Sequence, residues 1–536
     1  MQSNRSSLES SRIKFSPKIP TCLADLSLLS LEPFEGGLLR SEEITALFPY
    51  GSTLPLVKTT KNPTSKKRSL KIGVVFSGGQ APGGHNVISG LWDGLQKMGA
   101  GGQLIGFLEG PSGIIFEKYK ILSEDDVGSF RNTGGFDLLG SGRTKIETKE
   151  QFQKALKTCA TLKLDGLVII GGDDSNTNAA LLAEYFYQNQ CATSVVGVPK
   201  TIDGDLKNSF VPVSFGFDTA SRVYADLIGN LARDALSAKK YYHFVRLMGR
   251  TASHIALECA LLTHPNLTLI SEEVFEKKTT LKQIVEDLCN LVVERSSKGK
   301  SYGVILIPEG LIEWIPDLAM LIQELNYILS QETNLSMEDI KLKLTSASRD
   351  CFFLIPPAIQ KQLLLVRDPH GNVQVSLIET DRLLSEMVSN EMKKYTNISF
   401  HPLTHFFGYE GRSAFPSNFD ASYCYTLGQV ALLTISCNLS GYMGFVSNLH
   451  EPVENWSLGA VPLTALLHLE MRNGKLKPVI EKALVDLEGK AFQFFSKQRA
   501  AWRVEDHYSF PGPIQFTEDP TAPLSLFLEK QSTTPS

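Results

Sequence analysis

The chain has 536 residues, of which 42% are hydrophobic and 21% charged, and it carries a net charge of −4. A chain of this length can bury large cores and is expected to form more than one domain. The near-balanced charge argues against a nucleic-acid-binding surface, and no apolar run approaches the roughly 20 residues of a membrane span.

The N-terminal part, residues 1–68, is predicted to be an extension of the main body. It is Ser-rich at first, then Leu-rich around Leu26–Leu31, and basic at Lys58–Arg68. We interpret the leucines as a packing surface and the basic end as a solvated linker. The layout of a signal peptide is absent and the eight cysteines are scattered without a CxxC pair. We therefore expect reduced thiols, a cytoplasmic location, and neither nucleic-acid nor membrane partners.

The main body begins with an apolar run, Lys71–Phe76, that predicts a buried strand. A glycine-rich turn at Ser77–Gly83 and an amphipathic helix follow it. This order of strand, turn and helix presents backbone N–H groups to a phosphate. The turn lacks the Lys-Ser/Thr ending of a P-loop and the glycine spacing of a dinucleotide site, so a simple tight turn remains an alternative.

A second glycine-rich stretch follows the predicted strand Gln103–Phe107 and contains Arg143 and Lys145. Its glycines permit close approach of the backbone to a ligand, and the two cations offer charge-assisted hydrogen bonds to phosphate. Ordinary solvated charge explains the same residues equally well.

Two further strands end at clusters of polar residues. The run Leu167–Ile170 is followed by two glycines and by Asp173 and Asp174, and the run ending at Pro199 is followed by Lys200–Asp205. Carboxylates beside a bound phosphate require a cation, and Mg²⁺ binds through one or two carboxylates plus phosphates. Together with a lysine and a spare aspartate, this pattern indicates phosphoryl transfer. A helix N-cap and a surface turn are the alternative interpretation.

Strands and helices continue to alternate in the second half, which predicts a parallel sheet with helices on both faces. Residues 311–400 change to long helical runs, including Asp317–Leu329 and Leu377–Lys394, around a polar break at 368–372. The alternation resumes near His405, and the tail after Pro513 is polar. The expected elements are a helix at Asp218–Ser237, strands at Tyr242–Met248, Leu267–Ile270 and Val304–Ile307, a helix at Asp420–Cys437 and a strand at Gly444–Val446.

Six short motifs occur in order along the chain: Ser77–Gly83, Gly171–Asp174, Pro199–Asp205, Met248–Arg250, Pro308–Gly310 and Gly408–Arg412. Their order is that found in phosphofructokinases, and together they resemble the long-chain, pyrophosphate-dependent branch of that family. The resemblance covers about residues 71–516 and implies an α/β fold. That fold has two phosphofructokinase-type, Rossmann-like parallel-sheet subdomains with helices on both faces, a helical insertion and the N-terminal extension.

The resemblance also implies domain limits. Residues 69–240 would bind pyrophosphate and magnesium, and residues 241–310 with 401–516 would bind fructose phosphate. Some late segments could return to the first domain. Residues 311–400 would be the insertion, and residues 517–536 a tail.

The implied reaction is reversible transfer of a phosphoryl group from pyrophosphate to the 1-hydroxyl of fructose 6-phosphate, in glycolysis or gluconeogenesis. The products are fructose 1,6-bisphosphate and phosphate. By resemblance Asp203 is the base, Gly79 lies against pyrophosphate and Asp173 serves Mg²⁺. Lys240 and Tyr241 would enter a neighbouring subunit's sugar pocket, which requires a homodimer or larger oligomer. The other residues expected at the sugar phosphate are Thr201, Ile202, Met248, Gly249, Arg250, Glu309, Tyr409, Glu410, Gly411 and Arg412.

The choice of donor depends on Asp174 and Lys200, since ATP-using members of the family carry glycine at both positions. A carboxylate at Asp174 would repel an ATP α-phosphate by about 4 kcal/mol at ~4 Å and an effective dielectric of about 20. Lys200 would neutralise charge on the transferred phosphoryl group. A purely structural Asp174–Lys200 ion pair is one alternative. Others are an ATP-dependent 6-phosphofructokinase and a non-catalytic regulatory subunit of the same fold.

Overall fold

The computed structural model describes residues 5–34, 36, 38, 40–62, 68–99, 101–331, 335–365, 373–472 and 475–530. The chain forms two compact units, and each of them is described separately below. Unit 1 contains Met1–Ala220, Tyr409–Ala483 and Ile514–Leu526, and unit 2 contains Ser221–Gly408, Leu484–Pro513 and Phe527–Ser536. Two late segments therefore belong to the first unit, a possibility that the sequence left open. The polar break predicted at 368–372 lies outside the described residues.

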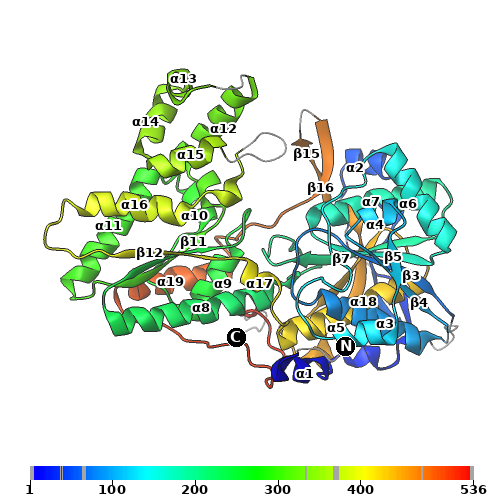
Figure 1. Ribbon diagram of the computed structural model, residues 1–536. Helices are drawn as coiled ribbons and strands as arrows, with labels where there is room; N and C mark the ends of the chain where they lie inside the picture. The colour runs from blue at the N-terminus through cyan, green and yellow to red at the C-terminus, as the bar shows by residue number, and fades with distance from the viewer. Residues whose placement is uncertain are drawn as a thin grey trace. The chain divides into compact units, whose positions relative to one another are not determined.

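Unit 1 is built on a mixed sheet in the order β1-β2-β14-β13-β7-β6-β3-β4-β5, with β8 pairing β7 (Figure 1). Its central strands β13, β7, β6, β3 and β4 are parallel, and the outer pairs are antiparallel. The central strands are apolar along their length because helices cover both faces. The strands are β1 (Leu29–Pro33), β2 (Val57–Lys61), β3 (Lys71–Phe76), β4 (Gln103–Phe107), β5 (Tyr119–Ile121), β6 (Gly166–Gly171), β7 (Ser194–Thr201), β8 (Phe215–Gly216), β13 (Tyr442–Ser447) and β14 (Ser457–Pro462), and a separate hairpin pairs β15 (Leu467–Arg472) with β16 (Lys475–Ile480).

Helices cover the two faces of this sheet. Leu167 and Ile169 of β6 share one core with α4, α6 and α7, whereas Gly166 faces Ile435 of α18 on the other side. Helix α18 packs closely on α3, and a capping box at Thr148 starts α6. The helices are α1 (Ser7–Ile13), α2 (Glu42–Leu47), α3 (Gly84–Met98), α4 (Ser112–Ile115), α5 (Glu124–Phe130), α6 (Lys149–Leu162), α7 (Asp173–Gln188), α17 (Tyr409–Arg412) and α18 (Asn418–Ser436).

The N-terminal extension is part of unit 1. Leu23 and Leu26 are buried, and Leu26 packs near Gly94 of α3, as expected for a packing surface. Residues 57–61 form β2, which lies between β1 and β14 at one side of the sheet. The predicted linker is thus a strand over its first residues, because this backbone completes hydrogen bonding at the sheet edge. Residues 63–67 of that predicted linker are outside the described part of the chain.

Unit 2 contains a parallel sheet in the order β10-β11-β9-β12. Tyr242, Phe244, Ile305 and Ile307 point from this sheet into a core shared with the surrounding helices. The strands are β9 (Tyr242–Leu247), β10 (Leu267–Thr268), β11 (Gly303–Pro308) and β12 (Pro402–Phe407). The helices outside the insertion are α8 (Phe217–Ala238, starting in unit 1), α9 (His254–Thr263), α10 (Ser271–Glu276), α11 (Leu281–Ser297), α19 (Lys490–Val504) and α20 (Leu524–Lys530, also starting in unit 1).

The helical insertion follows β11. It comprises α12 (Pro316–Gln331), α13 (Met337–Lys343), α14 (Ser346–Leu354), α15 (Pro357–Leu365) and α16 (Thr380–Met392). The sequence predicted its first and last helices. A buried ion pair of 2.9 Å between Arg246 of β9 and Asp381 holds α16 against the sheet. The predicted fold class, α/β with parallel sheets and a helical insertion, is confirmed.

All eight cysteines lie in described residues and are free thiols. None of the helices in the described ranges is both long and apolar enough to cross a membrane.

Candidate active site

In unit 1 the predicted donor loops meet at one edge of the sheet. Strands β3, β6 and β7 are parallel neighbours, with Phe76 opposite Ile170 and Gly171 opposite Pro199. The loops that follow their carboxyl ends therefore lie side by side, where α/β proteins bind ligands. Gly83 has a positive φ of 106° and is the N-cap residue directly before α3, which explains the glycine at this position of the turn.

Cationic side chains gather at the glycine-rich turn after β3. A Cβ built on Gly79 would lie 2.9 Å from Arg412 Nη1 and 3.7 Å from Arg143 Nη2. A Cβ built on Gly78 would lie 3.4 Å from Lys200 Nζ. Any side chain here would occupy the space in front of these cations. The missing side chains leave room for an anion, and the cations supply charge-assisted donors for it.

Lys200 is the most buried of these cations, with 7% of its surface exposed. Burial lowers the pKa of Lys200 to about 8, although the nearby Asp203 acts in the opposite direction. A buried ammonium has lost its hydration, and so it gains strongly from a phosphate oxygen that takes the place of water.

The aspartates of the two central loops are engaged differently from one another. The Asp174 carboxylate forms a 3.0 Å ion pair with Lys145. Asp173 and Asp205 share one cation, Lys482, whose Nζ is 3.5 Å from Asp173 Oδ2 and 3.8 Å from Asp205 Oδ2. Burial raises the pKa of Asp205 to about 6, and the neighbouring Asp203 adds to this shift.

The loop after β7 holds Asp203 close to the strand end. Its backbone N–H donates to Thr201 Oγ1 at 3.1 Å, and Gly204 has a positive φ of 75° that turns the chain directly after it. Asp203 itself is partly exposed, so a ligand could reach its carboxylate. Ile202 is 4% exposed, so a ligand can reach little more than its backbone.

Two side chains of this site escaped the sequence analysis. Lys482 follows β16, far along the chain from the aspartates, and no spacing or motif around it signals a function. Ser175 Oγ donates to Ser77 Oγ at 2.8 Å and links the start of α7 to the turn after β3. Ser175 directly follows Asp174, so its position in a loop motif was a usable signal.

The oxygen ligands at this edge of the sheet suit a hard divalent cation. Asp173 and Asp205 offer carboxylate oxygens, which Mg²⁺ prefers, and they lie close enough to share the ammonium of Lys482. Among the described residues, no group of three or more His, Cys, Asp or Glu side chains could hold a metal alone.

In unit 2 a second set of predicted residues lies at the carboxyl edge of its sheet. Met248, Gly249 and Arg250 follow β9, and Glu309 follows the neighbouring strand β11. Gly249 N–H donates to Glu309 Oε2 at 3.3 Å, and Glu309 is 4% exposed. A Cβ on Gly310 would lie 1.7 Å from the Arg250 carbonyl oxygen, so only glycine fits there.

Lys240 and Tyr241 lie at the other end of β9. They precede Tyr242, the first residue of the strand, whereas Met248 follows its last residue. Lys240 is exposed, and its Nζ lies 5.4 Å from the Tyr241 ring centre. At about 3.3 Å per residue, a strand of this length separates the two ends by roughly 20 Å. Within one chain these two groups of predicted residues are therefore apart.

Helix α17 carries the remaining predicted residues, and it belongs to unit 1. Tyr409 is 69% exposed, and its ring centre lies 5.4 Å from Arg412 Cζ. Glu410 is exposed and Gly411 is buried. The resemblance assigns Arg412 to the sugar phosphate, and in unit 1 its guanidinium lies beside Gly79 and Arg143.

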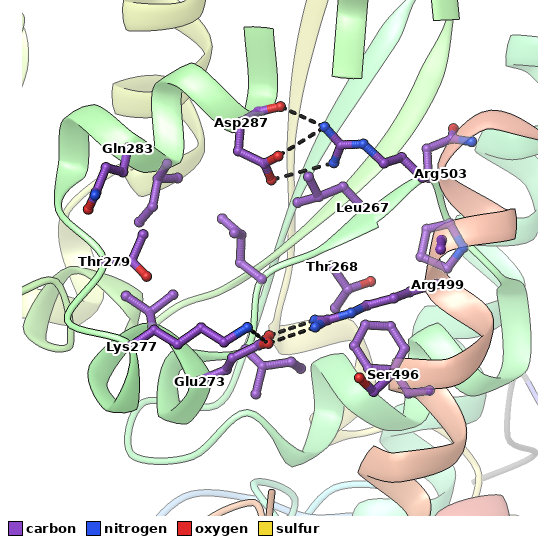
Figure 2. Close-up of a pocket in the computed structure, with 18 of the residues that line it drawn as sticks. Leu267, Thr268, Glu273, Lys277, Thr279, Gln283, Asp287, Ser496, Arg499 and Arg503 are labelled. Atoms are coloured by element: carbon purple, nitrogen blue, oxygen red, sulfur yellow. Dashed lines mark hydrogen bonds and ion pairs between the residues drawn. The ribbon is translucent and has the colours of Figure 1, made fainter. Parts of the chain in front are cut away.

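A cavity of about 580 Å³ occurs elsewhere in unit 2, between β10, α10, α11 and α19 (Figure 2). Figure 2 shows Glu273 between Arg499 and Lys277, and Asp287 beside Arg503. These ion pairs measure 2.6 Å for Arg499–Glu273, 2.6 Å for Lys277–Glu273 and 2.9 Å for Arg503–Asp287. Its labelled cations are already paired with carboxylates, and none of the described residues lining it is a predicted site residue. This cavity is therefore separate from the residues that the sequence singles out.

Comparison with known proteins identifies the family of the chain. The profile of a family described as Phosphofructokinase matches residues 71–435. The chain belongs to the phosphofructokinase family. It is 51% identical over 519 residues to pyrophosphate–fructose 6-phosphate 1-phosphotransferase subunit beta of Solanum tuberosum, covering 95% of this chain and 91% of that one. The family predicted from the six motifs is thus confirmed.

A bacterial relative is about equally similar. The chain is 53% identical over 468 residues to pyrophosphate–fructose 6-phosphate 1-phosphotransferase of Treponema pallidum (strain Nichols), covering 84% of this phosphofructokinase and 82% of that one. The crystal structure of a pyrophosphate-dependent phosphofructokinase from Nitrosospira multiformis matches with a TM-score of 0.54 at 16% identity, covering 82% and 93% of the two chains. At that identity the structural match supports the fold alone.

Proposed function

We propose that this phosphofructokinase transfers a phosphoryl group from pyrophosphate to the 1-hydroxyl of fructose 6-phosphate, in glycolysis. The products are fructose 1,6-bisphosphate and phosphate, and the reaction is reversible. Relatives that are about half identical over most of the chain carry the name of this activity. The predicted enzyme class follows from this similarity.

One observation in the structure supports pyrophosphate over ATP as the phosphoryl donor. Lys200 is buried beside the glycine-rich turn, and Asp174 begins the neighbouring helix α7. A carboxylate at Asp174 suits a short donor that ends at its second phosphate, and it repels a donor that continues into an α-phosphate. Lys200 stabilises negative charge that develops on the phosphoryl group and on the departing phosphate. Gly79, Arg143 and Lys145 complete the donor site.

Asp203 is the general base for the acceptor. Its carboxylate takes the proton of the sugar 1-hydroxyl as that oxygen attacks phosphorus, and in the reverse reaction it returns the proton. The base must lie within reach of both substrates, and Asp203 follows the end of β7, the strand next to the one that leads into Asp173 and Asp174. Thr201 and Ile202 of the same loop contact the acceptor.

Unit 2 supplies residues for the sugar phosphate. Met248, Gly249, Arg250 and Glu309 bind fructose 6-phosphate, with the Arg250 guanidinium on phosphate and the Glu309 carboxylate on sugar hydroxyls. Helix α17 adds Tyr409, Glu410, Gly411 and Arg412, and the position of Arg412 beside Gly79 allows it to reach donor phosphate oxygens too.

The active species is a homodimer or a larger homo-oligomer. Lys240 and Tyr241 lie at the end of β9 opposite to Met248–Arg250. One chain cannot place both ends of a strand against one sugar phosphate, since roughly 20 Å separates them. If both groups bind the same substrate, a second copy provides Lys240 and Tyr241.

Asp173 would hold Mg²⁺, with Asp205 as the nearby second carboxylate. The bound ion would neutralise charge on the pyrophosphate oxygens. The residues of the chain retain the other roles: Lys200 stabilises the phosphoryl charge, and Asp203 handles the proton.

The alternatives are less favoured. An ATP-dependent 6-phosphofructokinase would have to accommodate both the Asp174 carboxylate and the Lys200 ammonium. A non-catalytic regulatory subunit of the same fold has no need of a base, yet Asp203 and its supporting contact with Thr201 are present.

A comparison of donors tests the proposal. Wild-type protein should turn over pyrophosphate with fructose 6-phosphate and Mg²⁺, and show little or no turnover with ATP. Asp174→Gly should gain some ATP activity, because it removes the charge that repels an α-phosphate. Lys200→Gly should lose pyrophosphate turnover by about 10²–10³-fold, the usual loss on removing one such stabilising donor.

The readout is kcat/KM for each donor in the wild type, both single variants and the double variant. The effects of the two substitutions should not add, because both side chains act on the same phosphoryl group. A wild type that prefers ATP, or an Asp174→Gly variant with an unchanged donor ratio, would contradict the proposed specificity.

A further inference from the structure

Backbone hydrogen bonds fix the chain both before and after Lys482. Before it, Ile480 N–H donates to Thr177 Oγ1 on α7 at 3.2 Å. After it, Ala483 N–H donates to the carbonyl oxygen of Asp205 at 2.7 Å. The segment after β16 is thus attached both to the helix that begins at Asp173 and to the loop that contains Asp205. Its lysine is held at the donor site by backbone contacts.

The ammonium of Lys482 lies between two carboxylates from different loops. Its Nζ is 3.5 Å from Asp173 Oδ2 and 3.8 Å from Asp205 Oδ2. The Asp205 side chain is only 10% exposed, and that of Asp173 is 25% exposed. Water screens charges poorly at such a site, so two carboxylates held close together repel unless a cation lies between them.

The Lys482 side chain also has room to leave. It is 32% exposed, more than either of its carboxylate partners. A long lysine side chain has several rotatable bonds, so its ammonium can withdraw into solvent without movement of the backbone. The attachments at Ile480 and Ala483 would stay in place during that motion.

We propose that Lys482 is a positioning residue that substitutes for the divalent metal in the metal-free enzyme and competes with the metal for Asp173. Its ammonium keeps Asp173 and Asp205 together before the metal arrives. It must then move away from Asp173, because a cation bound there takes the same oxygen and repels a neighbouring ammonium. The inference rests on the proposed function, in which Asp173 serves Mg²⁺.

The test measures metal binding to the full chain without pyrophosphate or sugar phosphate. Mn²⁺ serves as the paramagnetic probe, and electron paramagnetic resonance counts the free ion. Lys482→Met should bind Mn²⁺ more tightly than the wild type, on the order of tenfold for the removal of one nearby positive charge. Lys482→Arg retains the charge and should stay within about threefold of the wild-type affinity.

Thermal unfolding gives a second, independent readout. Without metal, Lys482→Met should melt at a lower temperature than the wild type, because the carboxylates lose their cation. Saturating Mg²⁺ should raise its melting temperature by more than it raises that of the wild type, since a tighter ligand stabilises more. Lys482→Gln gives the same comparison with a polar neutral side chain, should the methionine variant fold poorly.

Lys477→Met is the matched control. Lys477 is exposed on β16 of the same hairpin, and its loss should change neither Mn²⁺ affinity nor the Mg²⁺-dependent shift in melting temperature. Unchanged or weaker Mn²⁺ binding in Lys482→Met would overturn the proposal. Mn²⁺ binding that survives Asp173→Asn would also overturn it, by placing the metal elsewhere. Failure of the proposed donor specificity would appear in the donor assay and would leave these metal measurements unaffected.

Discussion

Asp203 is the residue whose loss should affect chemistry most selectively. Asp203→Asn keeps the size of the side chain but removes its ability to accept a proton, so kcat should fall by about 10²–10⁴-fold. KM for fructose 6-phosphate should change little, because the ground-state contacts persist. The reaction from fructose 1,6-bisphosphate and phosphate should fall in parallel. Steady-state kinetics in both directions check this.

An exposed aspartate of the same unit, Asp125 of α5, provides the control for Asp203. Asp125→Asn should keep wild-type rates in both directions. Near-normal turnover in Asp203→Asn would remove this residue from the mechanism, and another group would then have to take the proton.

Lys200 should produce an alkaline limit of activity. Burial lowers its pKa to about 8, so the free enzyme loses this positive charge as pH rises through that value. We expect kcat/KM for pyrophosphate to fall above about pH 8, because this parameter reports ionisations of the free enzyme. In Lys200→Arg the guanidinium stays charged, so the limit should move to higher pH even if the rate is reduced. Identical alkaline limits in both proteins would assign that ionisation to another group.

At the scale of helices, the close contact between α3 and α18 requires a glycine on each of the two helices. A Cβ built on Gly90 would lie 2.1 Å from the carbonyl oxygen of Tyr425, and one on Gly428 would lie 2.2 Å from that of Val87. Both clashes are with backbone, which cannot move aside easily. Gly90→Ala should therefore lower the free energy of unfolding by about 1–3 kcal/mol, despite the higher helix propensity of alanine.

Gly128→Ala in α5 is a matched control for Gly90, since no atom beyond its chain neighbours and its own helix backbone lies within 4 Å of its built Cβ. That variant should be stabilised by about 0.5–1 kcal/mol, through helix propensity and reduced entropy of the unfolded chain. Urea unfolding of both proteins makes the comparison. A stabilised Gly90→Ala variant would show that the two helices can separate at little cost.

For the whole molecule, the separation of Lys240 and Tyr241 from Met248–Arg250 predicts active sites shared between subunits. A chain with Asp203→Asn and a chain with Lys240→Ala and Tyr241→Ala should each be nearly inactive. After they are unfolded and refolded together in equal amounts, about a quarter of the sites in a randomly mixed dimer combine the intact residues of both. The specific activity of the mixture should therefore recover to about a quarter of the wild-type value.

A chain that carries all three substitutions is the control for this mixing experiment. When mixed with either variant, it should recover no activity. Light scattering on the same samples reports the assembly state. A monomer with full specific activity, or mixtures without recovery, would contradict a shared pocket.

The sequence by itself determined the features that arise from residues close together along the chain, namely strands, the loops at their ends and short motifs. Apolar runs such as Lys71–Phe76 coincide with buried strands, because a continuous apolar run without polar alternation indicates burial on both faces. The polar loops after β6 and β7 follow from the same logic, since parallel strands end at one edge of a sheet. The six motifs, read in order, were sufficient to identify the family.

Only the tertiary structure decided which distant segments meet. Residues 409–483 return to unit 1, β2 pairs with β14, and Lys482 lies between Asp173 and Asp205. No periodicity or spacing records such contacts, because they arise from the packing of elements far apart along the chain. A lysine without a motif looks like any solvated charge until the fold places two carboxylates beside it.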